Sequence, residues 1–399
     1  MLRFSAKTTA GNNKLIATED RNKKIFFIKY CRFDFIPKMT KEELLKMKIS
    51  RIEKEIRDTP YNKSSEHHHG VLKAKLAKLL DELEGTPRRT GGGGGGYAPK
   101  HSGDASVVLV GFPSVGKSSL LNRATNADSR VADYDFTTLG VIPGMMKYKG
   151  IHIQIFDLPG IIEGAAQGKG FGKKVFSVIR SADLIVVVTD VHRINFLHKI
   201  RQELEEGGIR PNQDQPKIQI SRTSRGGIQV IDPFKDLGLS TMIDVAKEMC
   251  INNAVIQINE KVDNVDRLID GLSRSRKFLP VVEVVNKIDQ KQKLKRQSGI
   301  IYISAKNNIG MAEFKEAVWR GLGRVRVYLK QERGREADKR EPLIMKQDQT
   351  LDAVLKKISN EMRRDVNRAL IWGKQAKFPG QEVSLSFRIF DEMEIWFGR

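Results

Sequence analysis

The sequence has few of the residues that mark secreted or membrane proteins. It holds only 2 cysteines, Cys31 and Cys250, so it cannot build a disulfide framework, and we expect a reducing, cytoplasmic compartment. No apolar run approaches the ~20 residues of a membrane span. The N-terminus also lacks the compact apolar core of a secretory signal. These features argue against a membrane protein and against a secreted one.

Basic residues outnumber acidic ones. The chain has 70 Lys and Arg against 48 Asp and Glu, which gives a formal net charge of +22. This excess favours a polyanionic partner such as RNA, ribosomes or membrane headgroups. A generally basic surface without a dedicated partner is the alternative, because net charge alone does not locate a patch. The 399 residues are enough for two or three domains of roughly 100–200 residues each.

The first 38 residues differ from the rest of the chain. They contain nine Lys and Arg and three Asp and Glu, without a sustained apolar period. We interpret residues 1–38 as a non-native or disordered extension before a native start at Met39. A genuine basic tail is the alternative.

Residues 40–86 predict a hairpin of two amphipathic helices. Thr40 and Glu43 form a capping box at its start, and Pro60 lies in the polar break between the helices. We expect the two apolar stripes to pack against each other. The alternative use of the second helix is that its lysines face a polyanion; these are Lys73, Lys75 and Lys78. Residues 87–104 follow as a glycine-rich linker.

From residue 105 to 323, apolar strands alternate with helical stretches, which is the pattern of an α/β domain with a parallel sheet. Strands are predicted at 106–110, 151–156, 184–189, 281–285 and 300–303. Residues 324–399 form a last unit of short strands around one helix. Its strands are expected at 324–329, 342–345, 369–372 and 387–397, and its helix at 351–363.

A phosphate-binding loop follows the first predicted strand. Residues 111–118 read Gly-Phe-Pro-Ser-Val-Gly-Lys-Ser, with the strand before and the helix after that such a loop requires. Its backbone N–H groups can cradle phosphate oxygens, Lys117 can reach the β- and γ-phosphates, and Ser118 can ligate Mg²⁺. The predicted nucleotide contacts are Gly111, Pro113, Ser114, Val115, Gly116, Lys117, Ser118 and Ser119.

Two further segments complete the phosphate end of the site. Asp157 ends a predicted strand and can hold Mg²⁺ through water, and the Gly160 N–H can bond the γ-phosphate, so loss of that phosphate would release the loop. Between the phosphate loop and Asp157, Thr138 is our choice over its neighbour Thr137 as a further Mg²⁺ ligand. Catalytic roles are therefore expected for Lys117, Thr138 and Gly160, and metal-binding roles for Ser118, Thr138 and Asp157.

The last two segments predict guanine recognition. Residues 286–289 read Asn-Lys-Ile-Asp after an apolar strand, and the Asp289 carboxylate can accept from guanine N1–H and the exocyclic amine. Adenine offers neither donor there, so the carboxylate would reject it. Asn286 ties loops together, and the stem of Lys287 can lie on the base. A backbone N–H for guanine O6 comes from Ser304, Ala305 and Lys306.

These segments, in this order, resemble those of the Obg-related GTPases, and within that group the developmentally regulated GTP-binding (DRG) proteins of archaea and eukaryotes. The resemblance covers about residues 40–399 and extends to the C-terminal segments 369–373 and 377–381. It implies a P-loop GTPase domain at 105–323 with an inserted S5-like α+β subdomain at about 209–279. It also implies a C-terminal β-grasp TGS domain at 324–399.

The same resemblance implies a GTPase that hydrolyses GTP to GDP and phosphate as a molecular switch, with Mg²⁺, in translation or at the ribosome. It also implies an accessory protein of the type that partners DRG proteins. Ile161 stands where many regulatory GTPases place a water-orienting glutamine, so we expect slow intrinsic turnover that a partner or ribosome stimulates. Several related GTPases carry a potassium-binding Asn where this chain has Ser114, which leaves K⁺ dependence open.

Two other functions stay open at this point. One is an RNA- or ribosome-binding assembly factor in which GTP hydrolysis is incidental. The other is an ATPase of the Obg-like group, against which the Asn-Lys-Ile-Asp segment at 286–289 argues.

Overall fold

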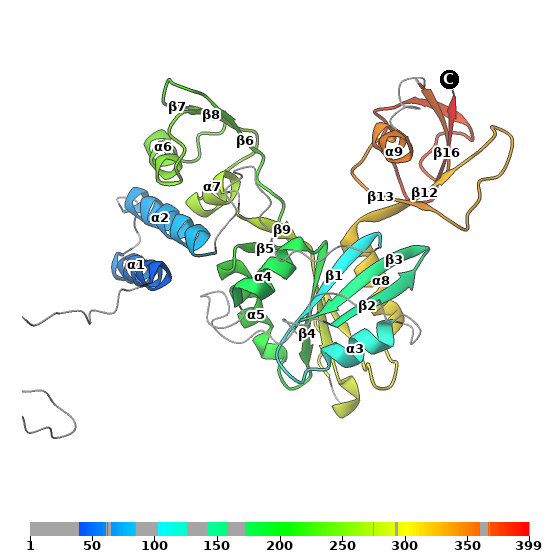
Figure 1. The fold of residues 1–399 in the computed structure, drawn as a ribbon, viewed down its shortest axis with the longest axis horizontal. Coiled ribbons are helices and arrows are strands. Elements are labelled where there is room, and N and C mark those ends of the chain that lie inside the picture. The colour runs from blue at the N-terminus through cyan, green and yellow to red at the C-terminus, as the bar shows by residue number, and fades with distance from the viewer. Residues whose placement is uncertain are drawn as a thin grey trace, which may run out of the picture. The chain divides into compact units, whose positions relative to one another are not determined.

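The structure of the protein is a computed structural model (Figure 1). It describes residues 40–60, 62, 65–84, 103–125, 142–158, 172–273, 275–291, 294–359, 366 and 368–398. The predictions for the 1–38 extension, for Thr137 and Thr138, for Gly160 and for most of the 87–104 linker fall outside these ranges. Among the helices within them, none is long and apolar enough to cross a lipid bilayer.

A six-stranded sheet forms the centre of residues 105–323 as far as the structure describes them. Its strand order is β11-β10-β4-β1-β3-β2. All neighbouring pairs run parallel except β2 and β3, which are antiparallel. The strands are β1 (Ala105–Val110), β2 (Ile142–Tyr148), β3 (Ile151–Asp157), β4 (Leu184–Asp190), β10 (Val281–Asn286) and β11 (Ile300–Tyr302).

Helices cover both faces of this sheet, and its strands are therefore nearly continuous apolar runs. Successive residues of β1 point to opposite faces, so Val107 and Leu109 belong to one core cluster and Val108 and Val110 to another. The first cluster includes residues of α3 and α8, and the second includes residues of α4 and α5. The helices are α3 (Lys117–Ala124), α4 (Gly172–Ser181), α5 (Leu197–Glu206) and α8 (Met311–Leu322). The predicted α/β architecture is confirmed.

The edge strand β2 is the part of this sheet that the sequence did not predict. Pro143 and Gly144 stand near its start, and both residue types ordinarily mark a turn or a break in a strand. Pro143 is tolerated because β2 lies at the edge of the sheet. Position 144 has room only for a glycine, because a Cβ there would lie 2.8 Å from Leu121 Cδ1 of α3.

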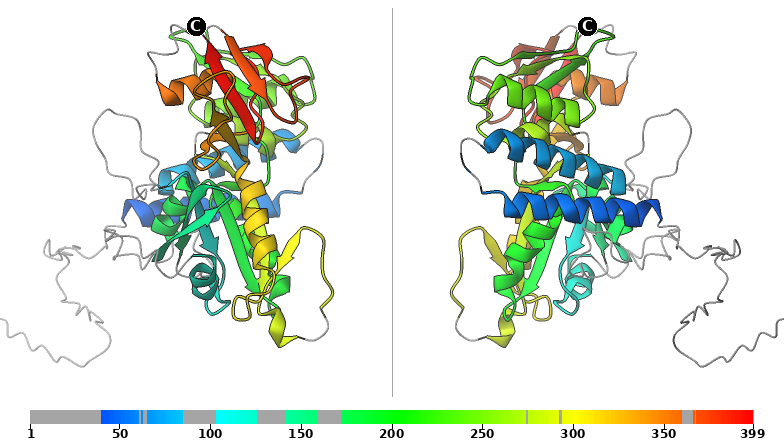
Figure 2. Two further views of the ribbon diagram at one scale, coloured as in Figure 1. Left: turned by 90° about the vertical axis from the view of Figure 1, so that its right-hand side faces the viewer. Right: turned by 90° about the vertical axis from the view of Figure 1, so that its left-hand side faces the viewer.

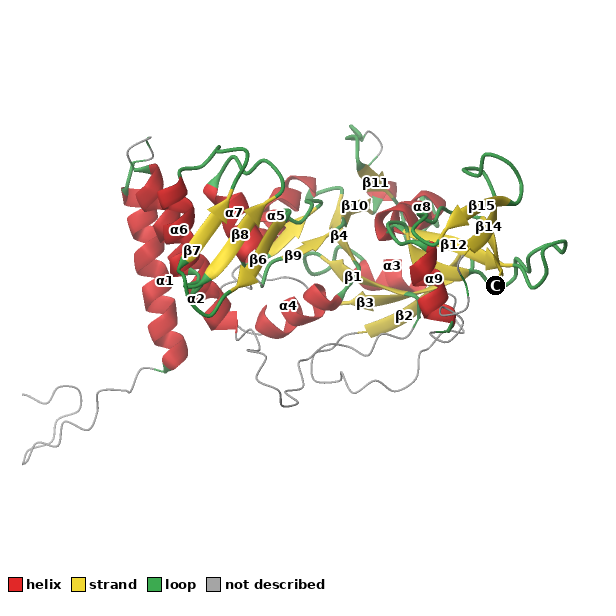
Figure 3. Ribbon diagram, turned by 90° about the horizontal axis from the view of Figure 1, so that it is seen from above, coloured by secondary structure: helices red, strands yellow, loops and turns green. Residues whose placement is uncertain are grey.

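A separate unit interrupts the chain between β5 (Ile209–Pro211) and β9 (Lys277–Leu279), two short strands that pair in parallel. We call residues 209–279 the inserted unit. It contains a three-stranded sheet in the order β6-β8-β7, which lies beside α6 and α7 in Figure 3. One apolar cluster joins these helices to the sheet. The elements are β6 (Ile218–Arg222), β7 (Ile228–Ile231), α6 (Leu239–Glu248), β8 (Ala254–Ile258) and α7 (Val265–Leu272).

Two helices precede the six-stranded sheet in the chain, α1 (Lys41–Asp58) and α2 (Glu66–Glu84). They lie side by side (Figure 2) and share an apolar cluster. The predicted capping box is confirmed: the Thr40 N–H donates to Glu43 Oε2 (2.7 Å), and the Glu43 N–H donates to Thr40 Oγ1 (3.2 Å). Pro60 lies just beyond the end of α1, as expected from its missing N–H.

The second of these helices also packs against the inserted unit. Ala74 of α2 is fully buried in the same apolar cluster as α6 and α7. Lys73 Nζ lies 2.7 Å from Asp266 Oδ2, and Lys75 Nζ lies 3.9 Å from Glu248 Oε1. These two lysines therefore pair with carboxylates of the inserted unit, which counts against the alternative that they face a polyanion.

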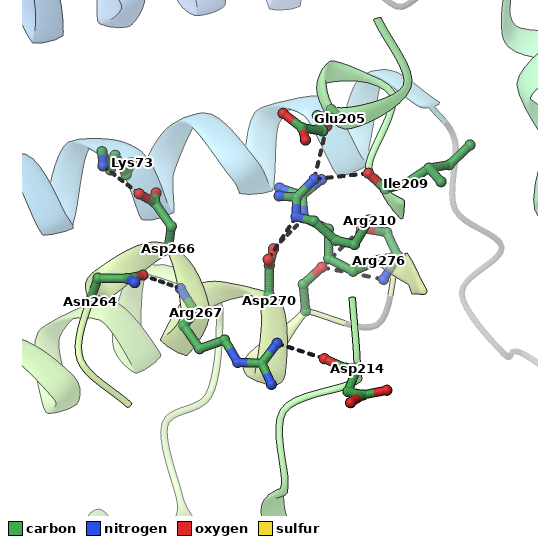
Figure 4. Close-up of polar contacts among 12 residues, drawn as sticks. Lys73, Glu205, Ile209, Arg210, Asp214, Asn264, Asp266, Arg267, Asp270 and Arg276 are labelled. Atoms are coloured by element: carbon green, nitrogen blue, oxygen red, sulfur yellow. Dashed lines mark hydrogen bonds and ion pairs between the residues drawn. The ribbon is translucent and has the colours of Figure 1, made fainter. Parts of the chain in front are cut away.

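A buried cluster of charges holds the connection between the six-stranded sheet and the inserted unit (Figure 4). Arg210 Nε donates to Asp270 Oδ2 (2.6 Å), and Arg276 Nε lies 3.4 Å from Asp270 Oδ1. The side chains of Asp270 and Arg276 are only 6% and 7% exposed. Arg210 lies in β5 and Arg276 directly precedes β9. One carboxylate of α7 thus joins both strands through which the inserted unit is attached, and we call this ion cluster the neck.

Residues 324–398 form a five-stranded sheet with one helix packed against it. The strand order is β13-β12-β16-β14-β15, and α9 shares a core cluster with the strands. The elements are β12 (Arg324–Leu329), β13 (Leu343–Lys346), α9 (Leu351–Ile358), β14 (Arg368–Trp372), β15 (Gln381–Ser384) and β16 (Met393–Gly398).

The structure of this C-terminal unit differs from the predictions in three places. The helix expected at 351–363 ends at Ile358, because the backbone of Ser359 is extended. The strand expected at 387–397 begins only at Met393, because Ile389 and Phe390 reach the core from a turn rather than from a strand. The short edge strand β15 was not predicted, since Gln-Glu-Val-Ser carries one apolar residue and therefore shows no period.

Candidate nucleotide-binding site

The loop at residues 111–116 joins β1 to α3 at the carboxyl end of the parallel strands. Gly116 has a left-handed backbone with φ 92°, and a Cβ there would lie 2.4 Å from Asn286 Nδ2. Ser114 also has a positive φ, 65°, a conformation that is unfavourable for a residue with a side chain. The backbone is therefore held in an unusual shape, as a phosphate cradle requires.

Side-chain donors engage the carbonyl groups of this loop. Each carbonyl from residue 111 to 116 accepts a hydrogen bond, and three of the four donors are cationic. The pairs are Lys117 Nζ with Gly111 O and Phe112 O (both 3.2 Å), Arg193 Nη1 with Pro113 O (3.0 Å), Lys287 Nζ with Ser114 O (2.6 Å), and Asn286 Nδ2 with Val115 O (3.1 Å) and Gly116 O (3.4 Å). These contacts fix the carbonyl groups of the loop, whose N–H groups (Pro113 has none) are the groups that a backbone nest offers to an anion.

Ser118 and Asp157 meet at the phosphate end of the loop. The Ser118 hydroxyl donates to Asp157 Oδ2 (2.5 Å), and Asp157 Oδ1 is buried without a hydrogen-bond partner among the described residues. Burial raises the pKa of the Asp157 carboxyl, opposed by the Ser118 hydrogen bond and the charge of Lys117. A hydroxyl and an unsatisfied carboxylate oxygen are ligands that suit Mg²⁺, so the residues present fit the predicted metal.

Lys117 lies at the same end and is only 7% exposed. Burial lowers the pKa of its ammonium group, opposed by the charge of Asp157. The hydrogen bonds of the ammonium go to two neutral carbonyls of the loop. A phosphate would offer a charged acceptor instead and would favour the protonated form.

The predicted base-binding residues surround a cleft of about 620 Å³ beside the loop. The Ser304 hydroxyl donates to Asp289 Oδ1 (2.5 Å). The Ala305 N–H donates to Asn286 Oδ1 (3.0 Å), while Asn286 Nδ2 donates to the phosphate loop. One amide side chain therefore joins the two halves of the site. The predicted residues that line the cleft are Gly116, Ser119, Asn286, Lys287, Asp289, Ala305 and Lys306.

The structure thus brings together the predicted residues from the phosphate loop, from the end of β3 and from the loops after β10 and β11. Thr138 and Gly160 lie outside the described residues, so their roles remain predictions. Val115 differs from the others because its side chain is completely buried in the core, and only its backbone can serve a ligand.

Two exposed arginines of this site were not predicted. Arg193 follows β4 and donates to Pro113 O, as described above. Arg123 of α3 donates from Nε to Ala305 O and from Nη2 to Lys306 O, both at 3.1 Å. Neither residue belongs to a motif, and both bind backbone carbonyls, so the sequence offers no signal that would mark them.

The chain is similar in sequence to known GTP-binding proteins. A family model described as a 50S ribosome-binding GTPase matches residues 106–222, and one described as the C-terminal region of the same domain matches residues 225–323. A GTP-binding protein of Methanocaldococcus jannaschii is 41% identical over 381 residues, which cover 92% of this chain and 96% of the relative.

Two eukaryotic relatives decide the family. The developmentally regulated GTP-binding protein 2 homologue of Dictyostelium discoideum is 37% identical over 354 residues. The ribosome-interacting GTPase 1 of Saccharomyces cerevisiae is 38% identical over 358 residues. Both comparisons cover 86% of this chain and 96% of the relative. The chain belongs to the family of developmentally regulated GTP-binding proteins. This DRG protein therefore has the GTPase domain that its phosphate loop predicts, and the family prediction is confirmed.

Proposed function

We propose that this DRG protein hydrolyses GTP to GDP and phosphate as a molecular switch that works at the ribosome or on RNA. The observation that carries the proposal is the Asn286 side chain, which joins an anion cradle to a loop suited to guanine. The relatives named as GTP-binding and as ribosome-interacting support the two halves of the proposal.

At the phosphate end, the backbone of residues 111–119 and the Lys117 ammonium hold the phosphates. Ser118, Asp157 and Thr138 would hold Mg²⁺, and the bound metal would supply positive charge at the oxygens of the transferred phosphoryl group. The Ser118 hydroxyl, which donates to Asp157 in this structure, would then serve as one of the metal ligands. The Gly160 N–H bonds the γ-phosphate, so hydrolysis frees the segment that follows Asp157.

At the base end, the Asp289 carboxylate selects guanine over adenine. The Ser304 hydroxyl fixes one of its oxygens, and the carboxylate accepts from guanine N1–H and the exocyclic amine. An adenine nucleotide would leave that acceptor unpaired. Calorimetry with GDP and ADP in the presence of Mg²⁺ tests this step. Equal affinities would reject it and would favour the ATPase alternative.

We further propose that turnover is slow without a stimulating partner. Ile161 has no polar group to orient the attacking water, so the rate depends on the metal, on Lys117 and on a factor that the chain does not contain. An accessory protein of the DRG-partner type, the ribosome and K⁺ are the proposed stimulants. Single-turnover hydrolysis with and without each of them provides the measurement, and a fast unstimulated rate would contradict the proposal.

The second candidate, an assembly factor with incidental hydrolysis, rests on the net charge of +22. Lys117→Ala separates the two functions, because it removes the phosphate contact without touching the rest of the surface. Loss of biological function with RNA binding intact supports the switch. Ribosome co-sedimentation with GDP and with a non-hydrolysable GTP analogue provides a second measurement, and equal binding in both states supports the assembly factor.

The remaining units receive family roles only as proposals. We propose that α1 and α2 form the helical hairpin of the family, that the inserted unit is its S5-like subdomain, and that residues 324–399 are its β-grasp TGS domain. The three-stranded sheet with two helices and the five-stranded sheet with one helix support these assignments. The three units are the proposed contacts with RNA or protein.

A further inference from the structure

The loop at residues 304–306, which is proposed to bind guanine, accepts hydrogen bonds from a side chain of α3 that also lines the base cleft. Arg123 Nε donates to Ala305 O and Arg123 Nη2 donates to Lys306 O, both at 3.1 Å. The planar guanidinium donates to the two carbonyls from two different nitrogens that are held in a fixed geometry, which an ammonium group does not offer. Arg123 thus fixes the orientation of two consecutive peptide groups.

The first of these peptide groups joins Ala305 to Lys306. In a trans peptide the C=O and the following N–H point in opposite directions. Because the Ala305 carbonyl turns toward Arg123, the Lys306 N–H turns away from it. The Ala305 N–H is already bonded to Asn286 Oδ1 (3.0 Å). Lys306 is therefore the residue of this loop whose N–H is available for guanine O6, and Lys306 lines the base cleft.

The second peptide group joins Lys306 to Asn307 and leads to Asp289. Its carbonyl accepts from Arg123, and its N–H, on Asn307, donates to Ser304 Oγ (3.2 Å). The same Ser304 hydroxyl donates to Asp289 Oδ1 (2.5 Å). The orientation of this peptide group is therefore linked, through the Ser304 hydroxyl, to the carboxylate that is proposed to bind guanine N1–H.

We propose that Arg123 is a positioning residue for guanine recognition. It directs the Lys306 N–H toward O6 and, through Asn307 and Ser304, keeps Asp289 in place for N1–H. This inference rests on the proposed binding of guanine nucleotides, and it adds which N–H meets O6 and which side chain outside the known motifs sets the base preference.

The test compares two ligands that share the ribose and phosphates. GDP carries O6 and N1–H, whereas the diphosphate of 2-aminopurine riboside lacks both. The measured quantity is the ratio of their dissociation constants, with the 2-aminopurine value as the numerator. In Arg123→Ala we expect this ratio to fall threefold to tenfold, about the effect of one hydrogen bond. Arg123→Lys should give an intermediate ratio, because the ammonium keeps the charge but not the fixed two-nitrogen geometry of the guanidinium.

Arg193→Ala is the matched control. Arg193 is also an exposed arginine that donates to a backbone carbonyl, but its acceptor is Pro113 O of the phosphate loop. We expect this variant to weaken both ligands by the same factor and to leave the ratio unchanged. An unchanged ratio in Arg123→Ala, or an equal fall in Arg193→Ala, would overturn the inference.

The wild-type protein separates this inference from the proposed function. If it binds ADP as well as GDP, the proposed guanine recognition itself fails. If it prefers GDP and only the ratio in the Arg123 variants stays constant, guanine recognition stands and Arg123 has no part in it. Should Arg123→Ala unfold, as judged by its thermal melt, Arg123→Lys decides the question alone, because it retains the charge and part of the contact.

Discussion

At the scale of single residues, the base cleft makes a prediction about Asp289. Its replacement in Asp289→Asn turns an acceptor into a side chain that can also donate. We expect the dissociation constant for GDP to rise by about 100-fold or more, because N1–H and the amine lose their charged acceptor. Xanthosine diphosphate, with a carbonyl in place of the amine, should then bind better than GDP. Competition calorimetry with both nucleotides measures the switch, and an unchanged order of affinity would contradict it.

A second residue-scale prediction concerns the buried Asp157 carboxyl. Folding raises its pKa, so the folded protein holds this proton more tightly than the unfolded chain does. The contribution of Asp157 to stability therefore falls as the pH rises through the range above its ordinary pKa. At neutral pH, Asp157→Asn should remove the free-energy cost of the buried charge and so raise the Tm of the nucleotide-free protein. The rise should be about 2–4 °C for each kcal/mol by which the free energy of unfolding increases.

The same substitution should remove the extra thermal stability that Mg²⁺ gives to the GDP complex, because an amide is a weak metal ligand compared with a carboxylate. For the wild type, the benefit of Mg²⁺ should shrink as the pH falls toward the raised pKa, since the protonated carboxyl cannot hold the metal. Thermal melts with and without Mg²⁺ across pH give both values. A nucleotide-free Asp157→Asn protein that melts below the wild type would contradict the prediction.

Sequence reasoning reached most residues of the site but not Arg123 and Arg193. Lys117, Asp157 and Asp289 are found because phosphate, Mg²⁺ and guanine each demand one residue type at a fixed point after a strand. A backbone carbonyl makes no such demand. Any long side chain with a hydrogen-bond donor can bind a backbone carbonyl that it reaches. The residues that hold these loops can therefore be identified only from the structure.

At the scale of elements, the neck makes a prediction about how the inserted unit is attached. Asp270→Ala would leave the buried Arg276 and the largely buried Arg210 without their carboxylate. We expect a loss of about 3–5 kcal/mol, because removing one partner of a buried ion pair is strongly destabilising. The matched control is Asp266→Ala on the same helix, whose 2.7 Å pair with Lys73 is largely exposed and should contribute about 0–1 kcal/mol.

Thermal melts of both neck variants and hydrogen exchange of α7 provide the measurements. We expect the Asp270 variant to lose protection in α7 and in the strands β5 and β9, and the Asp266 variant to resemble the wild type. Equal, small losses in the two variants would mean that the neck does not depend on this ion cluster.

The central strands of the sheets can be predicted from sequence, whereas some edge strands cannot. The parallel strands of the central sheet are predicted because burial on both faces demands continuous apolar runs. The edge strand β2 has Pro and Gly near its start, and the four-residue edge strand β15 has a single Val, so both resemble turns in sequence. Ile389 and Phe390 led to the opposite error, a strand predicted where there is none, because apolar residues can also fill a core from a turn.

At the scale of the whole molecule, the net charge of +22 predicts how binding to a ribosome or to RNA depends on salt. A protein that neutralises several phosphates releases their counterions, so its affinity falls steeply with ionic strength. With 6–10 phosphate contacts, affinity should fall by about 10³–10⁵-fold between 50 and 200 mM salt. Co-sedimentation at increasing KCl measures the slope. A flat response would indicate that the excess charge is only a solvated surface.

The bridge made by Asn286 has a consequence for how nucleotide would leave this protein. Its amide nitrogen holds the carbonyls of Val115 and Gly116, and its amide oxygen holds the N–H of Ala305. A protein that pulled residues 304–306 outward would disturb the phosphate loop through the same side chain. An exchange factor for this GTPase would therefore not need to contact the metal-binding residues. Displacement of residues 304–306 alone would weaken the binding of GDP at both its base and its phosphates.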